Sequence, residues 1–107
     1  MKWFKVHGYE WLHRSTKYEL TLEQRAIWID ILALASLGDE PGSFEYFSIE
    51  ALAYEIKAPV EILEAALRRF VEVKKIKWDE DRKIITVLNW EKYQSEYQRQ
   101  KPYRKKK

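Results

Sequence analysis

The sequence contains no cysteine, and its 107 residues include only three glycines and three prolines. The lack of thiols excludes disulfides and thiolate metal sites, which fits a reducing compartment. The glycines are too scattered to form a phosphate-binding loop. No stretch approaches the roughly 18 apolar residues of a membrane span, and the start lacks the apolar region and cleavage site of a signal peptide. We therefore expect a cytoplasmic protein without a membrane partner.

Catalytic constellations are also missing. The few serines fall mostly at expected caps and turns, with no adjacent base motif. His7 and His13 are the only histidines, and no acidic cluster accompanies them. The acidic triplet Asp79–Asp81 falls where a hairpin turn is expected, so turn formation explains it better than metal binding. We expect no enzyme activity, no cofactor and no metal site.

What the chain does contain is enough apolar and aromatic material for one folded domain. Hydrophobic residues make up 46% of it, with five Trp, seven Tyr and four Phe. The net charge of +3 is unevenly distributed. Residues 1–88 hold 13 Lys/Arg against 15 Asp/Glu, whereas residues 89–107 hold 7 against 2. An anionic partner would therefore contact mainly the Lys and Arg residues of the tail.

Two short helices and a β-hairpin are predicted between residues 48 and 88. Ser48 is a good N-cap, and apolar residues recur after it at helical spacing. Pro59 suits the first position of the second helix. We expect that helix to bury Val60, Leu63, Ala66, Leu67, Phe70 and Val71. The apolar period then changes to two, which is typical of strands. The expected elements are helices 48–56 and 59–73 and strands near 75–79 and 83–88.

A long helix over residues 21–37 precedes this unit. Its start, Thr21–Gln24, fits a capping box, and Gly38 is a natural C′ residue for its end. A short strand near 44–47 would complete a three-stranded sheet with the hairpin. Further upstream we expect a short helix near 8–15 that brings Trp11 and Leu12 inward. The opening segment Trp3–Val6 would add an edge strand or pack on the body.

The chain ends in an aromatic helix and a basic segment. Asn89 can cap a final helix that places Trp90, Tyr93 and Tyr97 at i, i+3 and i+7. This aromatic stripe could stack on bases, but packing against the body is the favoured interpretation. Residues 99–107, called the basic arm below, are too rich in charge for a stable helix.

These elements predict a mainly α fold with a small β-sheet (α+β). The architecture is a winged helix-turn-helix with an added N-terminal segment and a C-terminal helix plus basic arm. We expect residues 1–98 to form the winged-helix domain and residues 99–107 to form a flexible arm or the start of a linker.

If the domain binds DNA, its candidate residues lie late on the second helix, on the hairpin and in the arm. Glu61 and Glu64 occupy the start of the second helix, where a recognition helix contacts base edges, and carboxylates there are unfavourable. The alternative to DNA contact for the hairpin lysines is that they only cover a strand face exposed to solvent. The alternative for the arm is a linker that keeps the protein soluble. The candidates are Arg68, Arg69, Lys74, Lys75, Lys77, Arg82, Lys83, Arg99, Lys101, Arg104, Lys105, Lys106 and Lys107.

Taken together, the chain resembles the N-terminal domain of phage replisome organisers and DnaD-like primosomal proteins. The matching stretches are Trp3–Val6, Leu20–Leu37, Ile49–Ala53 and Ile85–Lys101. The run Asn89–Gln94 followed by a basic arm is the most characteristic of them, because the helix-turn-helix part is generic to winged-helix proteins. In that family a separate C-terminal region follows, so this chain resembles an N-terminal fragment.

The resemblance implies a role in starting DNA replication, with DNA and the replicative helicase or its loader as partners. It also implies a possible homo-oligomer, since the family's winged-helix domain is known as an oligomerisation module. Two alternatives stay open. One is a self-association or protein–protein scaffold domain of the same machinery, and the other is a sequence-specific transcription regulator, which Glu61 and Glu64 disfavour.

Overall fold

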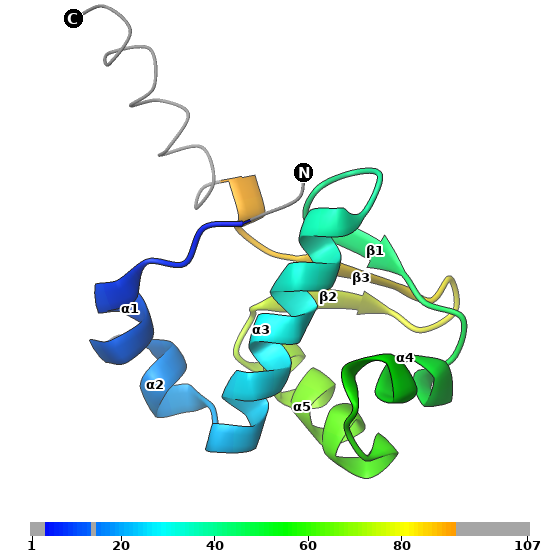
Figure 1. Cartoon of the computed structure of the whole chain (residues 1–107), viewed down its shortest axis with the longest axis horizontal. Coiled ribbons are helices and arrows are strands. Elements are labelled where there is room, and N and C mark those ends of the chain that lie inside the picture. Colours follow the sequence, from blue (N-terminus) through cyan, green and yellow to red (C-terminus); the bar gives the residue numbers. More distant parts are fainter. Residues whose placement is uncertain (1–3, 14, 92–107) are drawn as a thin grey trace, which may run out of the picture.

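Five α-helices and a three-stranded antiparallel sheet make up residues 4–13 and 15–91, the part of the chain described by this computed structural model (Figure 1). This is the small winged-helix-like α+β fold that the sequence predicts. The elements, in chain order, are α1 (Gly8–His13), α2 (Ser15–Glu19), α3 (Leu22–Leu37), β1 (Ser43–Glu45), α4 (Ile49–Ile56), α5 (Val60–Glu72), β2 (Ile76–Asp79) and β3 (Ile84–Val87).

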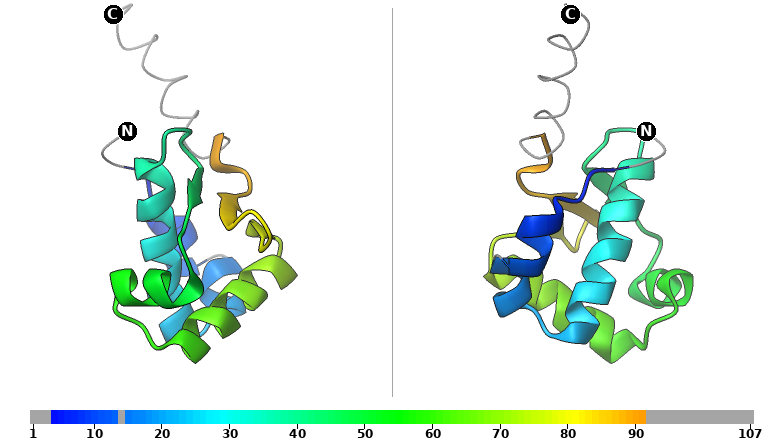
Figure 2. Two further views of the ribbon diagram at one scale, coloured as in Figure 1. Left: turned by 90° about the vertical axis from the view of Figure 1, so that its right-hand side faces the viewer. Right: turned by 60° about the vertical axis from the view of Figure 1, so that its left-hand side comes forward.

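The sheet has the strand order β1-β3-β2, and both pairings are antiparallel. In its central rung, Phe44 of β1 lies opposite Ile85 of β3, which lies opposite Trp78 of β2. Phe44 and Ile85 are buried, and α3 and α5 both contact the sheet. As Figure 2 shows, the helices lie on one side of the three strands.

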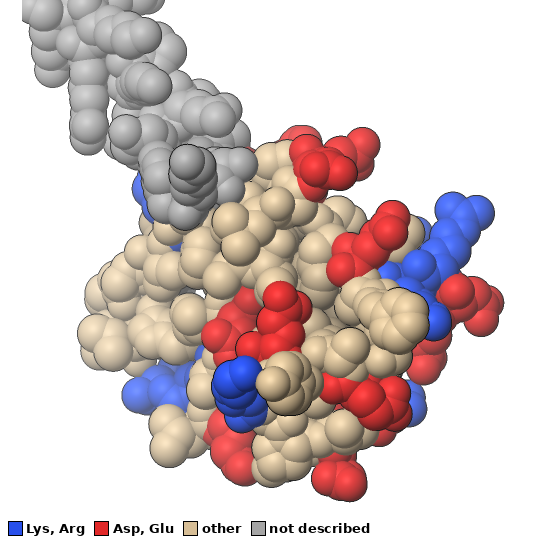
Figure 3. All heavy atoms as spheres, turned by 45° about the vertical axis from the view of Figure 1, so that its right-hand side comes forward, with Lys and Arg blue, Asp and Glu red and all other residues tan. Residues whose placement is uncertain are grey.

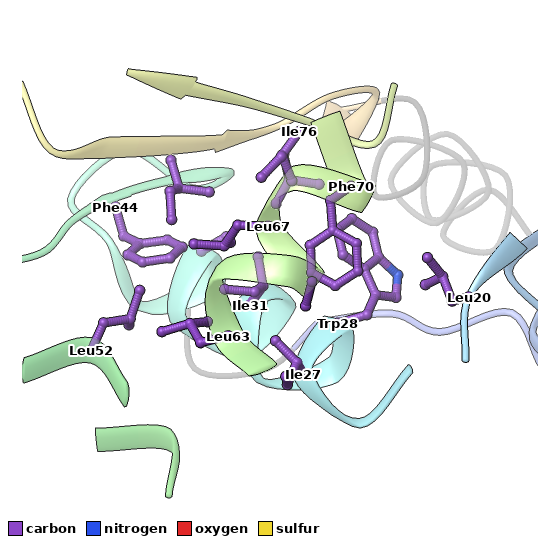
Figure 4. Close-up of a cluster of buried hydrophobic side chains, with 14 of the residues drawn as sticks. Leu20, Ile27, Trp28, Ile31, Phe44, Leu52, Leu63, Leu67, Phe70 and Ile76 are labelled. Atoms are coloured by element: carbon purple, nitrogen blue, oxygen red, sulfur yellow. The ribbon is translucent and has the colours of Figure 1, made fainter. Parts of the chain in front are cut away.

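The core forms where α3 and α5 meet under the sheet (Figure 4). Ile31 of α3 and Leu63 and Leu67 of α5 have no exposed surface. The rings of Trp28 and Phe70 meet edge to face with centroids 5.2 Å apart. Burying side chains of this size contributes roughly 1.5–3 kcal/mol each, so this contact contributes strongly to the attachment of α5 to the body.

Two predicted helix starts are confirmed in detail. At the start of α3 the Gln24 amide donates to Thr21 Oγ1 (3.2 Å) and the Thr21 amide donates to Gln24 Oε1 (3.0 Å), which completes the capping box. At the start of α4 the Ala51 amide donates to Ser48 Oγ (3.0 Å). Both caps satisfy amides that have no partner inside the helix.

Three local predictions need correction. Pro59 is the N-cap of α5, and the helix begins one residue later, at Val60. Val71 is 43% exposed, because it lies about 100° around the helix from the buried Phe70. Leu12 is 53% exposed while Trp11 packs against the core, since adjacent residues of a helix point about 100° apart.

The two glycines around the α3–β1 loop act through their missing side chains. Gly38 ends α3 as expected but has a φ of −65°, so it does not adopt the left-handed conformation of a C′ glycine. A Cβ at Gly38 would lie 2.1 Å from the carbonyl oxygen of Ser43. Gly42 does have a positive φ, 104°, and a Cβ there would lie 2.9 Å from Cγ of Trp90. Close chain approach therefore requires glycine at both positions.

The two ends of the described chain meet over the core. Trp90 is 6% exposed, and its ring lies near that of Phe4, with centroids 6.5 Å apart. Residues 4–6 form no strand, and Phe4 packs against the core, which agrees with the second of the two expectations for this segment. Trp3 lies outside the described residues. The expected inward packing of the aromatic stripe is confirmed for Trp90. Tyr93 and Tyr97 lie outside the described residues.

Candidate nucleic-acid interface

The β2–β3 hairpin is the wing of this fold, and residues 74–83 are called the wing below. Its turn is closed by the Asp79 carboxylate, whose Oδ1 accepts a hydrogen bond from the Arg82 amide (3.0 Å). Part of the acidic triplet therefore shapes the turn, as expected. Lys83 follows with a φ of 58° and leads the chain into β3.

Four exposed cations surround this hairpin: Lys74, Lys77, Arg82 and Lys83, called the wing cations below. Lys77 lies opposite Thr86 in the β2–β3 register, and Thr86 Oγ1 lies 2.8 Å from Ser43 Oγ of β1. An exposed ammonium and two hydroxyl groups thus share one rung of the sheet. Groups of this kind commonly contact phosphate oxygens.

The wing cations include two residues in a costly backbone conformation. Lys74 has a φ of 61° and Lys83 a φ of 58°, in the left-handed region that favours glycine. For a residue with a Cβ this conformation costs roughly 1–2 kcal/mol. Both positions hold lysine and not glycine, so the folded domain carries the conformational cost at Lys74 and at Lys83.

Arg68 lies on the exposed side of α5. Its guanidinium lies over the Trp78 ring at 5.6 Å from the centroid, and its Nη2 lies 3.9 Å from Glu64 Oε2. The side chain remains 64% exposed. These contacts are weak at such exposure, so Arg68 is available to an anionic ligand from the side of the wing.

Arg69 and Lys75, two further candidates, are engaged in contacts that hold α2 against the body. Arg69 Nε donates to the Glu19 carbonyl (2.9 Å), and its Nη1 pairs with the Glu72 carboxylate. Lys75 Nζ donates to Thr16 Oγ1 (3.2 Å) and lies 3.6 Å from Glu19 Oε1. The Lys75 side chain is only 14% exposed. The structure therefore gives both cations an intramolecular role.

The helix pair that would enter a groove is acidic on its exposed side. Glu61, Glu64 and Glu72 of α5 are exposed or half-buried, and so are Glu50 and Glu55 of α4. In Figure 3 acidic side chains are spread over the visible face, while Lys and Arg side chains lie at its right-hand edge, at its centre and at its left. A phosphate backbone is thus disfavoured along α4 and the start of α5. The wing has more cations than carboxylates, although the exposed Glu80 and Asp81 at its turn partly offset them.

The basic arm candidates, Arg99, Lys101, Arg104, Lys105, Lys106 and Lys107, lie outside the described residues. Within the described part of the chain, no group of three or more His, Asp or Glu side chains is arranged to hold a metal ion. None of the helices described there has the length and apolar character needed to cross a membrane.

Comparisons with protein-family models, curated proteins and solved structures gave no match to this chain. The interface must therefore be judged from its own residues. One of these escaped the sequence analysis. Phe47, expected in the first strand, instead follows β1 and is 83% exposed beside the wing. The sequence does show that Phe47 directly precedes the N-cap Ser48, but an apolar residue at that position normally packs against the helix and is not expected to be exposed.

Proposed function

We propose that this winged-helix domain binds DNA through phosphate contacts made by the wing cations and the basic arm. The observation that carries the proposal is the arrangement of Lys74, Lys77, Arg82 and Lys83 as exposed cations around one hairpin. Each cation that neutralises a phosphate releases condensed counterions, and this release drives binding with little dependence on base sequence.

The acidic side of α5 supports a binding mode led by the wing. A helix that inserts into the major groove would bring Glu61 and Glu64 toward phosphates and base edges. Arg68 lies further along the same helix, over Trp78 of β2, and can join the wing in holding the backbone. We therefore expect affinity without strong sequence preference, which disfavours the role of a specific transcription regulator.

The biological setting that we propose is the initiation of DNA replication in a phage or bacterium. It rests on the resemblance of the chain to replisome organisers and DnaD-like primosomal proteins, including the Asn89–Gln94 run. In that setting the domain would hold DNA while the replicative helicase or its loader is recruited.

The test is a salt-dependent titration of fluorescent single- and double-stranded DNA. It compares the intact chain, a chain ending at Gln98, and the variants Lys77→Ala and Lys83→Gln. Each lost phosphate contact should flatten the plot of log K against log salt by about 0.7–0.9. Lys17→Ala is the matched control, because Lys17 is an exposed lysine on α2. Absence of binding by the intact chain, or equal slopes for all variants, would refute the proposal.

A second candidate function is a self-association or scaffold domain, and the acidic exposed side of α4 and α5 favours it. Five carboxylates there, Glu50, Glu55, Glu61, Glu64 and Glu72, suit a basic protein surface better than DNA. In this case sedimentation should reveal a dimer or larger species that grows with concentration. A monomer at high micromolar concentration would argue decisively against this function.

A further inference from the structure

Phe47 stands apart from the other Phe and Trp side chains of the described residues. In the described residues it is the one Phe or Trp with a highly exposed ring, at 83%, whereas Phe44 and Phe70 are buried and Phe4 packs on the core. Burying a Phe ring contributes roughly 1.5–3 kcal/mol, and the fold does not use this contribution at Phe47.

The local structure makes this exposure unexpected. Phe47 directly precedes Ser48, the N-cap of α4. An apolar residue at this position usually packs on the fourth residue of the helix, which here is Leu52. Leu52 is 2% exposed and Phe47 is 83% exposed, so the ring of Phe47 gains little from such a contact.

The ring lies beside the wing. The Tyr46 amide donates to the Lys83 carbonyl (3.0 Å), which fixes the β1–α4 connection next to the wing turn (Figure 1). The Lys83 ammonium lies over the Phe47 ring at 5.7 Å from its centroid. One exposed aromatic face and one exposed cation are therefore presented together.

We propose that Phe47 stacks on an unpaired base of DNA while Lys83 and Arg82 contact the flanking phosphates. The inference rests on the proposed function and adds the ligand's class, a single-stranded or locally opened segment. Proteins that bind single strands combine cations along the backbone with aromatic rings under the bases. An exposed aromatic ring with adjacent cations matches this pattern better than a protein interface, whose binding energy comes from clustered, desolvated anchors.

The experiment uses the intact chain and two fluorescent oligothymidylates of equal length, one normal and one with central abasic sites. A stacked base contributes roughly 1–3 kcal/mol, so the chain should bind the normal strand about tenfold more tightly. Phe47→Ala should bind both strands equally, and Phe47→Trp should keep the preference. Lys83→Gln should weaken binding to both strands by a similar factor, because it removes charge and no ring.

Tyr18→Ala is the matched control, because Tyr18 is 82% exposed on α2. This variant should keep the preference for the normal strand. Urea unfolding should place Phe47→Ala within about 0.5 kcal/mol of the parent chain, as expected for an exposed position, so lost binding cannot be attributed to lost folding.

The outcomes separate the two proposals. If the intact chain binds neither strand, the proposed function fails and this inference fails with it. If the chain binds both strands equally, or if Phe47→Ala keeps the base preference, only the stacking role is overturned. If Phe47→Ala leaves the preference intact but dissolves a dimer seen by sedimentation, the ring belongs to an interface between copies of the chain.

Discussion

Replacing Lys75 by Ala tests whether this cation holds the fold together or binds DNA. Its ammonium donates to Thr16 Oγ1 (3.2 Å), lies 3.6 Å from Glu19 Oε1 and sits 5.7 Å from the centroid of the Trp28 ring. A hydrogen bond to a charged group contributes about 1.5–3 kcal/mol, and the largely buried lysine stem adds packing. We expect Lys75→Ala to lower the free energy of unfolding by about 2 kcal/mol.

Arg69→Ala should act in the same direction. The variant loses the 2.9 Å bond from Arg69 Nε to the Glu19 carbonyl. The arginine side chain is 35% exposed, so water replaces part of the lost contact and we expect a smaller cost of about 1 kcal/mol. Both variants loosen the attachment of α2 to the body.

The assay is urea unfolding followed by tryptophan fluorescence, with Lys77→Ala as the control. Lys77 is exposed on β2, so its removal should change stability by no more than about 0.5 kcal/mol. In the DNA titration we expect the larger effect from Lys77→Ala and not from Lys75→Ala. Lys77→Ala flattens the salt slope, and Lys75→Ala leaves the slope unchanged, since a loss of about 2 kcal/mol from a typical 5–15 kcal/mol keeps the domain folded.

A double-mutant cycle with Glu19→Gln checks the pair directly, and we expect a coupling energy of about 0.5–1 kcal/mol. The reasoning would be refuted if Lys75→Ala were as stable as Lys77→Ala. A salt slope lowered equally by both variants would also refute it, because that result would make Lys75 a phosphate contact.

Three further predictions concern the stability of the domain. Gly42→Ala should destabilise by about 2 kcal/mol or more in urea unfolding, because φ at Gly42 is 104° and a Cβ would lie 2.9 Å from Trp90; an unchanged midpoint would contradict this. Ser48→Ala should cost about 1 kcal/mol through the lost cap on the Ala51 amide, and Ser48→Thr should restore most of it. Burial raises the pKa of the Asp30 carboxyl above its ordinary value, so its ionisation opposes folding at pH 7. Asp30→Asn should therefore raise the free energy of unfolding at pH 7. This gain should vanish as the pH falls through the pKa of Asp30 in the folded chain and then through its pKa in the unfolded chain. A gain of equal size at low pH would contradict this account.

Sequence reasoning succeeded for features that depend on a few neighbouring residues. The caps at Thr21 and Ser48 each join a side chain to an amide three residues away, so the pattern of residue types was sufficient to predict them. The change from helical to alternating apolar spacing after Glu72 likewise predicted the hairpin, because the period of burial follows from backbone geometry.

Only the tertiary structure decided which cations remain free for a ligand. Arg69 and Lys75 look like Lys74 and Lys77 in the sequence, yet their partners on α2 lie 50 and 59 residues away along the chain. No local pattern encodes such a contact, because it depends on how α2 packs against α5.

The same distinction applies to Gly38 and Phe47. The end of α3 at Gly38 was predictable from residue type, but the 2.1 Å approach that a Cβ would make to Ser43 depends on the path of the returning chain. Phe47 looked like one more apolar strand residue, and its exposure beside Lys83 follows from where β1 ends against the wing. The sequence by itself determined the order of the elements from residue 21 onward and the caps at Thr21 and Ser48, because these depend on short-range bonds and periodicity. It did not predict the separate helix α2, the span of β1 or the start of α5 at Val60. The tertiary structure determined which side chains are left at the surface, because exposure depends on every segment that packs nearby.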